Sequence, residues 1–208
     1  DTVPYTVQLA AEVVDANRQS VAGQASAIMH PAGAYLGIGL DSWVFKKGEK
    51  ITTRIVSVDF DGKIVPALGG ELRLERSEWK LVFDKDRTRD TSHWENLWPV
   101  IGKCGFKTGA SAVECDVTPD KGGYYRLVAA GKDAAGRAME SVRYVWVAGP
   151  DFEKRDDDYT VDIVFDKERY EVGDTARILV TSPFPKARAL LTWSRLGLVR
   201  RNLIKHLK

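Results

Sequence analysis

Two phrases near the start of the chain return more than a hundred residues later, and this repetition restricts the possible folds more than any other feature. The segment around Asp15 is similar to the segment around Asp133, a shift of 118 residues. The same shift aligns Leu9 with Leu127. A repeat of this length is large enough to bury a core of its own, so the repetition predicts tandem copies of one domain type.

A second echo joins the phrase that begins at Asp41 to the phrase that begins at Asp166, a shift of 125 residues. A closing phrase therefore comes first, an opening phrase comes last, and one complete copy lies between them. We predict the last strands of one module over residues 1–34, a complete β-sandwich over 35–149 with an inserted loop near 80–97, a linker over 150–158, and the first strands of the next module over 159–208.

Hydrophobic residues alternate with polar ones along most of the chain, which is typical of β-strands with one buried face. Leu72 and Leu74 form one such face, and Val142, Tyr144 and Trp146 form another. Asp-Gly and similar pairs mark reverse turns between these segments. The pattern predicts an all-β fold of antiparallel, immunoglobulin-like or fibronectin-III-like sandwiches.

The cut modules at the two ends suggest two further hypotheses. Short strand pairs are marginally stable, so the two ends could pair with each other, within one chain or between two chains. The tail from Leu198 to Leu207 fits an amphipathic helix at a membrane surface, a strand pair that is cut short, or an extension that is foreign to the natural protein.

Charge and motifs argue against several classes of function. The chain carries 31 basic and 29 acidic residues and a net charge of +2, without the basic stripe of a nucleic-acid-binding protein. None of the three histidines, His30, His93 and His206, lies beside a nucleophile or in a metal-binding motif. Asp59 and Asp61 are better explained as turn residues. We expect no enzyme activity, catalytic residue, metal or cofactor.

The two cysteines, Cys104 and Cys115, are close enough in sequence to join neighbouring strands. An exported protein would pair them in a disulfide bond, whereas a cytosolic protein would keep two buried thiols. The modular architecture favours the disulfide.

Three tryptophans, Trp79, Trp94 and Trp98, flank a stretch of mixed charges from Lys80 to Glu95. Such a charged stretch is typical of a solvated loop. Exposed tryptophans there could contact a sugar or a protein partner. The competing explanation is that Trp79 and Trp98 anchor the two ends of the insertion in the core. Large aromatic side chains are mostly buried in folded proteins, which favours this explanation.

Taken together, the phrases resemble the bacterial alpha-2-macroglobulins. The phrase from Asp166 to Pro183 resembles the start of the bait-associated module region in that family. The segment from Gly122 through the Asp133 turn, with the Cys104/Cys115 pair, resembles the macroglobulin module before it. Residues from Val13 to Gly33 resemble the end of a still earlier module, and the resemblance extends to about Leu196.

The resemblance implies a scaffold segment of a protease-trapping inhibitor used in host defence. In that family a protease cuts a bait, the modules rearrange, and a thioester can capture the attacker. Neither cysteine here begins a Cys-x-Glu-Gln motif, so we expect no thioester in this chain. The implied partners are proteases, through the full-length parent, neighbouring macroglobulin modules, and a periplasmic peptidoglycan-synthesis protein.

The same resemblance implies a periplasmic protein anchored in the membrane by a lipidated N-terminus that lies outside this segment. We expect no nucleic-acid partner and no direct membrane contact from the segment itself. The alternative hypothesis is an immunoglobulin-like adhesin or carbohydrate-binding array, which an exposed platform formed by Trp79, Trp94 and Trp98 would favour.

Overall fold

The computed structural model describes residues 2–86, 89–150, 159–184, 188–194 and 197–204. Every regular element in these ranges is a β-strand, which confirms the expected all-β fold. Accordingly, no helix in the described part is long and apolar enough to cross a membrane. The predicted linker over 150–158 falls almost entirely outside the described residues.

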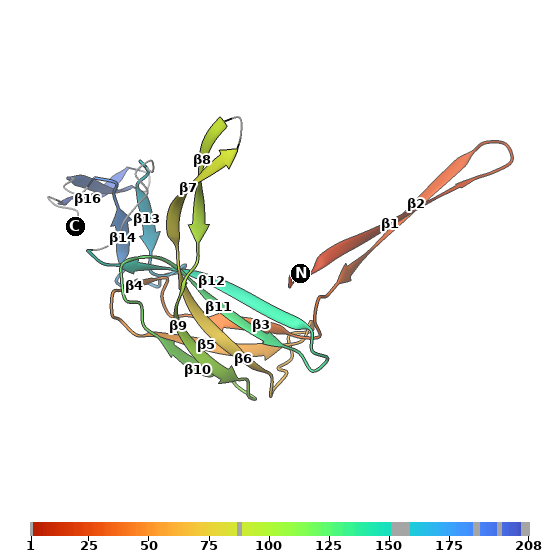
Figure 1. Ribbon diagram of the computed structural model, residues 1–208, viewed down its shortest axis with the longest axis horizontal. Coiled ribbons are helices and arrows are strands. Elements are labelled where there is room, and N and C mark those ends of the chain that lie inside the picture. The colour runs from red at the N-terminus through yellow and green to blue at the C-terminus, as the bar shows by residue number, and fades with distance from the viewer. Residues whose placement is uncertain (1, 87–88, 151–158, 185–187, 195–196, 205–208) are drawn as a thin grey trace.

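A sandwich of two β-sheets occupies the centre of the molecule (Figure 1). The smaller sheet has the strand order β10 (Val113–Val117), β5 (Ile51–Val58) and β3 (Tyr35–Gly39). The larger sheet has the order β4 (Val44–Lys46), β12 (Ala138–Ala148), β11 (Gly123–Lys132), β6 (Gly69–Arg76) and β9 (Val100–Lys107). All of these pairs are antiparallel except β4 with β12, which run parallel. Strand β3 lies against β11 and β12, so the two sheets face each other.

The core lies between the two sheets and is built from alternate residues of their strands. Its most buried side chains include Ile55 on the smaller sheet and Leu72, Leu74 and Leu127 on the larger one. The expected buried face of β6 is therefore confirmed. Two-residue periodicity places every second side chain on the inner face, which is why short alternating segments suffice to build this core.

The predicted inner face of β12 is wrong. Val145 and Val147 are fully buried, whereas Tyr144 is 46% exposed and lies on the opposite side of the strand with Trp146. Both faces of this strand carry apolar side chains, so periodicity identifies two candidate faces but does not choose between them.

The expected disulfide is present and joins Cys104 on β9 to Cys115 on β10. It therefore connects the larger sheet to the smaller one, across the side of the sandwich where β9 and β10 approach each other. The alternative of two free thiols is excluded, since both cysteines are in the bond.

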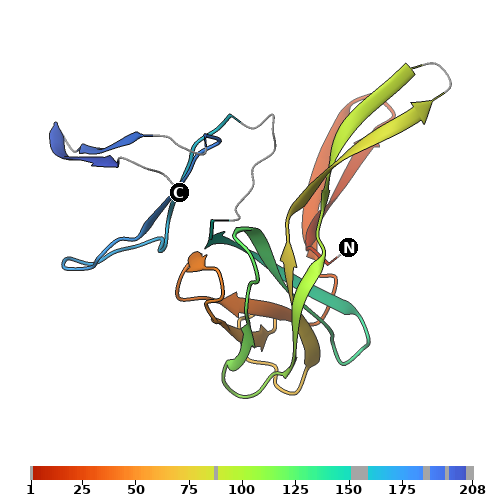
Figure 2. The same cartoon turned by 60° about the vertical axis from the view of Figure 1, so that its left-hand side comes forward.

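The charged insertion is a two-stranded hairpin rather than a loop. Strands β7 (Glu78–Asp86) and β8 (Arg89–Leu97) pair in one antiparallel register and project from the larger sheet (Figures 1 and 2). Strand β7 follows directly after the end of β6, and β8 ends just before β9 begins, so the hairpin is an extension of these two strands. The mixed charges are compatible with strands because an isolated hairpin leaves both faces open to water.

The first sequence echo is a structural copy, residue for residue. Strands β1 (Tyr5–Val14) and β2 (Ser20–Met29) form a hairpin with the same register as β11 and β12: Leu9 opposes Ala25, and Leu127 opposes Arg143. A shift of 118 residues maps one pair onto the other. Unlike β11 and β12, this hairpin extends away from the sandwich (Figure 1).

The second echo is also a structural copy. Strands β13 (Asp162–Phe165) and β14 (Ile178–Thr181) pair Ile163 with Val180, and a shift of 125 residues maps this pair onto Ile38 and Ile55 of β3 and β5. The tail forms β15 (Ala189–Ser194) and β16 (Leu198–Ile204), so the helical alternative for Leu198 to Ile204 is wrong. Residues beyond Ile204 lie outside the described part.

The two ends do not pair within one chain. Strands β1 and β2 form a sheet of their own, as do β13 with β14 and β15 with β16. Figures 1 and 2 both place the N-terminal hairpin and the C-terminal strands on different sides of the sandwich. The hypothesis of pairing within one chain is therefore wrong for this conformation.

Candidate functional site

Four aromatic residues form a cluster on the outer face of the larger sheet. Tyr124 stacks on Tyr144 with ring centroids 5.4 Å apart and planes 5° apart, and it also lies 4.8 Å from Trp146. Trp98 completes the cluster, 6.1 Å from each tyrosine ring. Tyr124 points outward because its neighbour on β11, Tyr125, is fully buried on the inner face. We call these four residues the outer aromatic cluster.

A network of charged residues packs against the Trp98 ring of this cluster. The guanidinium carbon of Arg126 lies 4.4 Å from the centroid of the Trp98 ring, in cation–π geometry. Its Nε donates to Glu75 Oε2 at 2.6 Å, and Arg73 Nε donates to Glu75 Oε1 at 2.9 Å. Glu75 is buried, so these two arginines supply the charge compensation that a buried carboxylate needs.

The ring geometry argues against a sugar-binding platform. Sugars stack on an open aromatic face, but one face of each tyrosine covers the other, and Arg126 covers a face of Trp98. Burial, followed by the nearby Tyr144 hydroxyl, raises the pKa of Tyr124, so its hydroxyl remains a neutral hydrogen-bonding group. The stacking and the cation–π contact therefore reduce the ring face that is available to a sugar.

Trp79 and Trp94 lie elsewhere, on the projecting hairpin. Trp79 opposes Asn96, and Leu81 opposes Trp94, so the two tryptophans share one face of the hairpin with Phe83. Trp79 is 45% exposed and Phe83 is 70% exposed, while Trp94 is half-buried. The expectation that Trp79 and Trp98 anchor the insertion in the core is wrong, because neither belongs to the core cluster.

Hydrogen bonds and ion pairs connect the base of the hairpin to the larger sheet. Ser77 donates its backbone N–H to Tyr124 O at 2.8 Å and its hydroxyl to Asn96 Oδ1 at 2.9 Å. Arg76 contacts both Glu78 and Asp120. Although burial of Arg76 opposes its charge, Glu78, Tyr125 and Asp120 together hold its pKa above the ordinary value. These bonds attach the base of the hairpin to the backbone of Tyr124, a member of the outer aromatic cluster.

The joint between the N-terminal hairpin and the sandwich centres on Asp133. Its Oδ2 accepts hydrogen bonds from the backbone N–H of Gly33 and from Arg137 Nε, each at 2.8 Å. Gly33 belongs to the connection between β2 and β3, and its neighbours Ala32 and Ala34 are buried. One carboxylate thus binds the incoming chain to the turn between β11 and β12.

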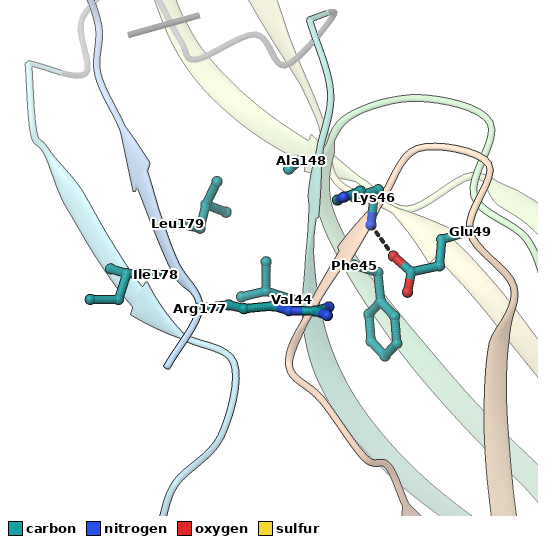
Figure 3. A pocket seen from close by; sticks show the side chains of 8 residues that line it. All are labelled: Val44, Phe45, Lys46, Glu49, Ala148, Arg177, Ile178 and Leu179. Atoms are coloured by element: carbon teal, nitrogen blue, oxygen red, sulfur yellow. Dashed lines mark hydrogen bonds between the residues drawn. The ribbon is translucent and has the colours of Figure 1, made fainter. Parts of the chain in front are cut away.

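The opposite joint connects the sandwich to the C-terminal strands. Trp43 donates its backbone N–H to Asp166 O at 2.9 Å and accepts from Trp146 N through its own carbonyl. A cavity of about 360 Å³ opens beside it (Figure 3). Its lining combines β4 and β14, and consists of Val44, Phe45, Lys46, Glu49, Ala148, Arg177, Ile178 and Leu179. Both joints therefore depend on an aspartate of a repeated phrase, one through its side chain and one through its carbonyl.

No cluster of three or more histidine, cysteine or acidic residues capable of holding a metal ion occurs within the described ranges. Asp59 accepts from the backbone N–H groups of Asp61 and Lys63, each at 2.9 Å, as a turn residue does. Tyr124 was not among the residues predicted for a site, and the predicted face for Tyr144 and Trp146 was wrong. The available signal was the alternation at the start of β11, where the outward positions Tyr124 and Arg126 flank the inward Tyr125.

Comparisons with known proteins locate these features within a family. No protein-family profile matches the chain. An alpha-2-macroglobulin homolog of Nostoc sp. is 22% identical over 187 residues, which cover 88% of this chain and 10% of that protein. The alpha-2-macroglobulin of Ralstonia nicotianae is 33% identical over 147 residues, covering 69% of this chain and 8% of that protein. The chain belongs to the alpha-2-macroglobulin family. It spans about a tenth of the length of these alpha-2-macroglobulins.

A solved structure of Escherichia coli alpha-2-macroglobulin in its native conformation also matches the chain, with a TM-score of 0.48 and 16% identity. The match covers 98% of this chain and 14% of that one. Within this alpha-2-macroglobulin segment, both cysteines are engaged in the disulfide, so neither is available for a thioester.

Proposed function

We propose that this chain is a non-catalytic scaffold segment of a protease-trapping inhibitor. The observation that carries the proposal is its sequence kinship with alpha-2-macroglobulins along most of its length. The residue-for-residue repeats support an array in which 1–34 close one module, 35–149 form the next, 150–158 link, and 159–208 open a third. Such an array acts mechanically. Its rigid sandwiches fix the distances between distant parts of the protein, and the joints fix the angles between neighbouring modules.

The two joints are the parts of this segment that would transmit a rearrangement. At Asp133, one hydrogen bond from the Gly33 backbone connects the N-terminal hairpin to the turn of the sandwich, and the neighbouring Ala32 and Ala34 are buried. At Trp43, one backbone hydrogen bond connects the sandwich to the next strands, beside the cavity of about 360 Å³. Because a cavity lies at the second joint, we place the movement between modules there.

The proposed location is the periplasm, with the membrane anchor on a lipidated N-terminus of the parent protein. Support comes from the Cys104–Cys115 disulfide, because such bonds persist in oxidising compartments. The proposed partners are proteases, acting on the parent, and neighbouring macroglobulin modules. Neither the fold nor the comparisons bear on the peptidoglycan-synthesis partner, which stays an expectation from the resemblance.

The test measures trapping by the polypeptide encoded by the full reading frame that contains these residues. It is incubated with an endopeptidase, and the remaining activity is assayed on a large protein substrate and on a small peptide. A trap blocks the large substrate and spares the small one. Equal loss on both substrates, or no loss on either, would contradict the proposal.

A further inference from the structure

A short connection, residues 30–34, joins β2 to β3 and lies directly against the sandwich. Ala32 and Ala34 are each only 2% exposed and belong to the core of the sandwich. A Cβ atom added at Gly33 would lie 2.8 Å from Arg137 Nη2, so a side chain at this position would crowd the turn between β11 and β12. The backbone of the connection is therefore packed closely against the complete sandwich.

The first residue of this connection, His30, packs its ring against two aromatic rings of the sandwich. Its ring centroid lies 4.7 Å from that of Phe60, with the planes 32° apart, and 5.8 Å from that of Tyr35, in an edge-on arrangement at 70°. His30 Nδ1 also shares a hydrogen bond of 2.5 Å with the Tyr35 hydroxyl, and the tautomer of His30 determines which group donates. Aromatic rings at these separations attract one another, so His30 adds a side-chain contact to the joint.

Phe60 attaches the connection to the smaller sheet. It lies in the turn that follows β5, and Asp59 makes the side-chain hydrogen bonds that close this turn, which leaves the Phe60 ring to contact His30. In the larger sheet, the turn between β11 and β12 binds the same connection through the hydrogen bond from Gly33 to Asp133. Two attachments on different sheets restrict rotation of the connection about either one.

The two sequence echoes differ in shift by seven residues, and this difference lies in the connections between modules. Met29 and Val147 are equivalent under the shift of 118 residues, and Leu36 and Val161 are equivalent under the shift of 125. Seven positions separate Met29 from Leu36, whereas fourteen separate Val147 from Val161. The first joint therefore has the shorter connection, and a shorter connection leaves less freedom between the strands that it joins.

The second connection also lacks the two rings that the first one provides. Ala148 is the counterpart of His30, and Thr160 is the counterpart of Tyr35. Neither a methyl group nor a threonine side chain can reproduce a pair of packed rings. The aromatic contact is therefore specific to the first joint, as the short connection is.

We propose that His30, Tyr35 and Phe60 form a latch that fixes the angle between the N-terminal hairpin and the sandwich. With the latch closed, these two units move as one rigid body, and relative motion within the segment takes place at the second joint. The latch is a property of this segment by itself. Its part in a rearrangement of modules rests on the proposed trapping function.

Hydrogen exchange of the Gly33 backbone amide reports opening of the first joint, because its hydrogen bond to Asp133 must break first. His30→Ala and Phe60→Ala each remove one partner of the aromatic contact. Each should accelerate this exchange about three- to tenfold, which is the change expected from the loss of one aromatic pair. Ile64→Ala is the matched control, because it truncates another exposed side chain between β5 and β6, and it should exchange like the wild type.

A double variant shows whether the two rings act on each other. His30→Ala combined with Phe60→Ala should accelerate exchange no more than His30→Ala alone, because one contact can be lost only once. Tyr35→Phe keeps the ring and removes the hydroxyl, so it measures the hydrogen bond separately. The His30 and Phe60 side chains are exposed, so the sandwich should retain its melting temperature in these variants.

Nitrogen-15 relaxation of the amides of Ala32, Gly33 and Ala34 measures the rigidity of the connection. The wild type should give order parameters of about 0.85, as rigid backbone does, and both single variants should give lower values. Three results would overturn the proposal: wild-type order parameters as low as those of the variants, unchanged Gly33 exchange in either single variant, or a double variant whose acceleration is the product of the two single effects. The trapping assay is independent of these measurements, so the latch and the proposed function can fail separately.

Discussion

At the scale of single residues, aspartates organise the turns of this molecule. Asp15, Asp59 and Asp133 each accept hydrogen bonds from the backbone N–H groups two and four residues later. Each thereby closes a five-residue turn, as short polar side chains commonly do. Asp133 differs from the other two because its second oxygen also binds Gly33 and Arg137. A turn residue has thus become the connection between two elements.

Asp133→Asn should destabilise the chain near neutral pH and should change how its stability depends on pH. The hydrogen bond from the Gly33 backbone, with further bonds from Arg137 and Ala135, lowers the Asp133 pKa from 3.8 to about 2. A lowered pKa stabilises the folded state above pH 3.8, and this contribution is lost as the pH falls towards 2. The difference in stability between wild type and Asp133→Asn should therefore shrink over this range.

The measurement is urea unfolding of both proteins at several pH values. Asp59→Asn is the comparison, because that residue makes the same turn without the bonds to a second segment. A constant difference between wild type and Asp133→Asn across the acid range would contradict the assignment.

Thr53 is the residue whose replacement should stabilise the molecule. Its side chain is fully buried, and its hydroxyl has no hydrogen-bond partner among the described residues. The repeat places Ile178 at the equivalent position of β14. Thr53→Val removes an unsatisfied hydroxyl at nearly constant volume and should raise the free energy of unfolding by about 1 kcal/mol. Chemical denaturation measures the change, and a clear loss of stability would show that the hydroxyl has a partner.

At the scale of the elements, the two copies of one hairpin differ at the point where the turn is most constrained. Arg18 and Gly136 occupy equivalent turn positions with φ of 64° and 80°. Glycine adopts this left-handed conformation without steric cost, whereas a residue with a Cβ atom does not. The turn of β1–β2 therefore carries strain that the turn of β11–β12 avoids.

Placing each residue at the other's position should destabilise the sandwich and stabilise the N-terminal hairpin. Gly136→Arg should lower the free energy of unfolding of the sandwich by about 1–2 kcal/mol, through backbone strain and without a clash, since nothing lies within 4 Å of an added Cβ. Arg18→Gly should slow amide exchange in β1 and β2 by relieving the same strain. Unfolding curves and amide exchange report the two effects, and equal behaviour of both variants would refute the comparison.

At the scale of the whole molecule, a hairpin that is covered by a second sheet should be more stable than the same hairpin without one. Strands β11 and β12 are covered by the smaller sheet, while β1 and β2 have the same register and no covering layer within the described part of the chain. An isolated hairpin is marginally stable in water, whereas a sandwich unfolds as a unit. The disulfide between the sheets adds about 3 kcal/mol in the chain-entropy description of a loop of this size.

Amide hydrogen exchange of the wild-type chain at low concentration provides the test. Backbone amides of β11 and β12 should exchange at the rate of global unfolding, and equivalent amides of β1 and β2 should exchange orders of magnitude faster. Equal protection of the two hairpins would mean that the strand register, and not the covering layer, determines the stability of a hairpin.

The sequence by itself determined the all-β class, the repeated phrases, the disulfide pair and the buried face of β6. These features are readable because alternation and turn chemistry are local, and because the repeats compare the chain with itself. Only the tertiary structure decided which face of β12 turns inward, that Lys80 to Glu95 belongs to a projecting hairpin, and that Trp98 joins Tyr124 and Tyr144 outside the core. The physical reason is that a strand with apolar side chains on both faces has two acceptable orientations, and only the layer packed against it selects one.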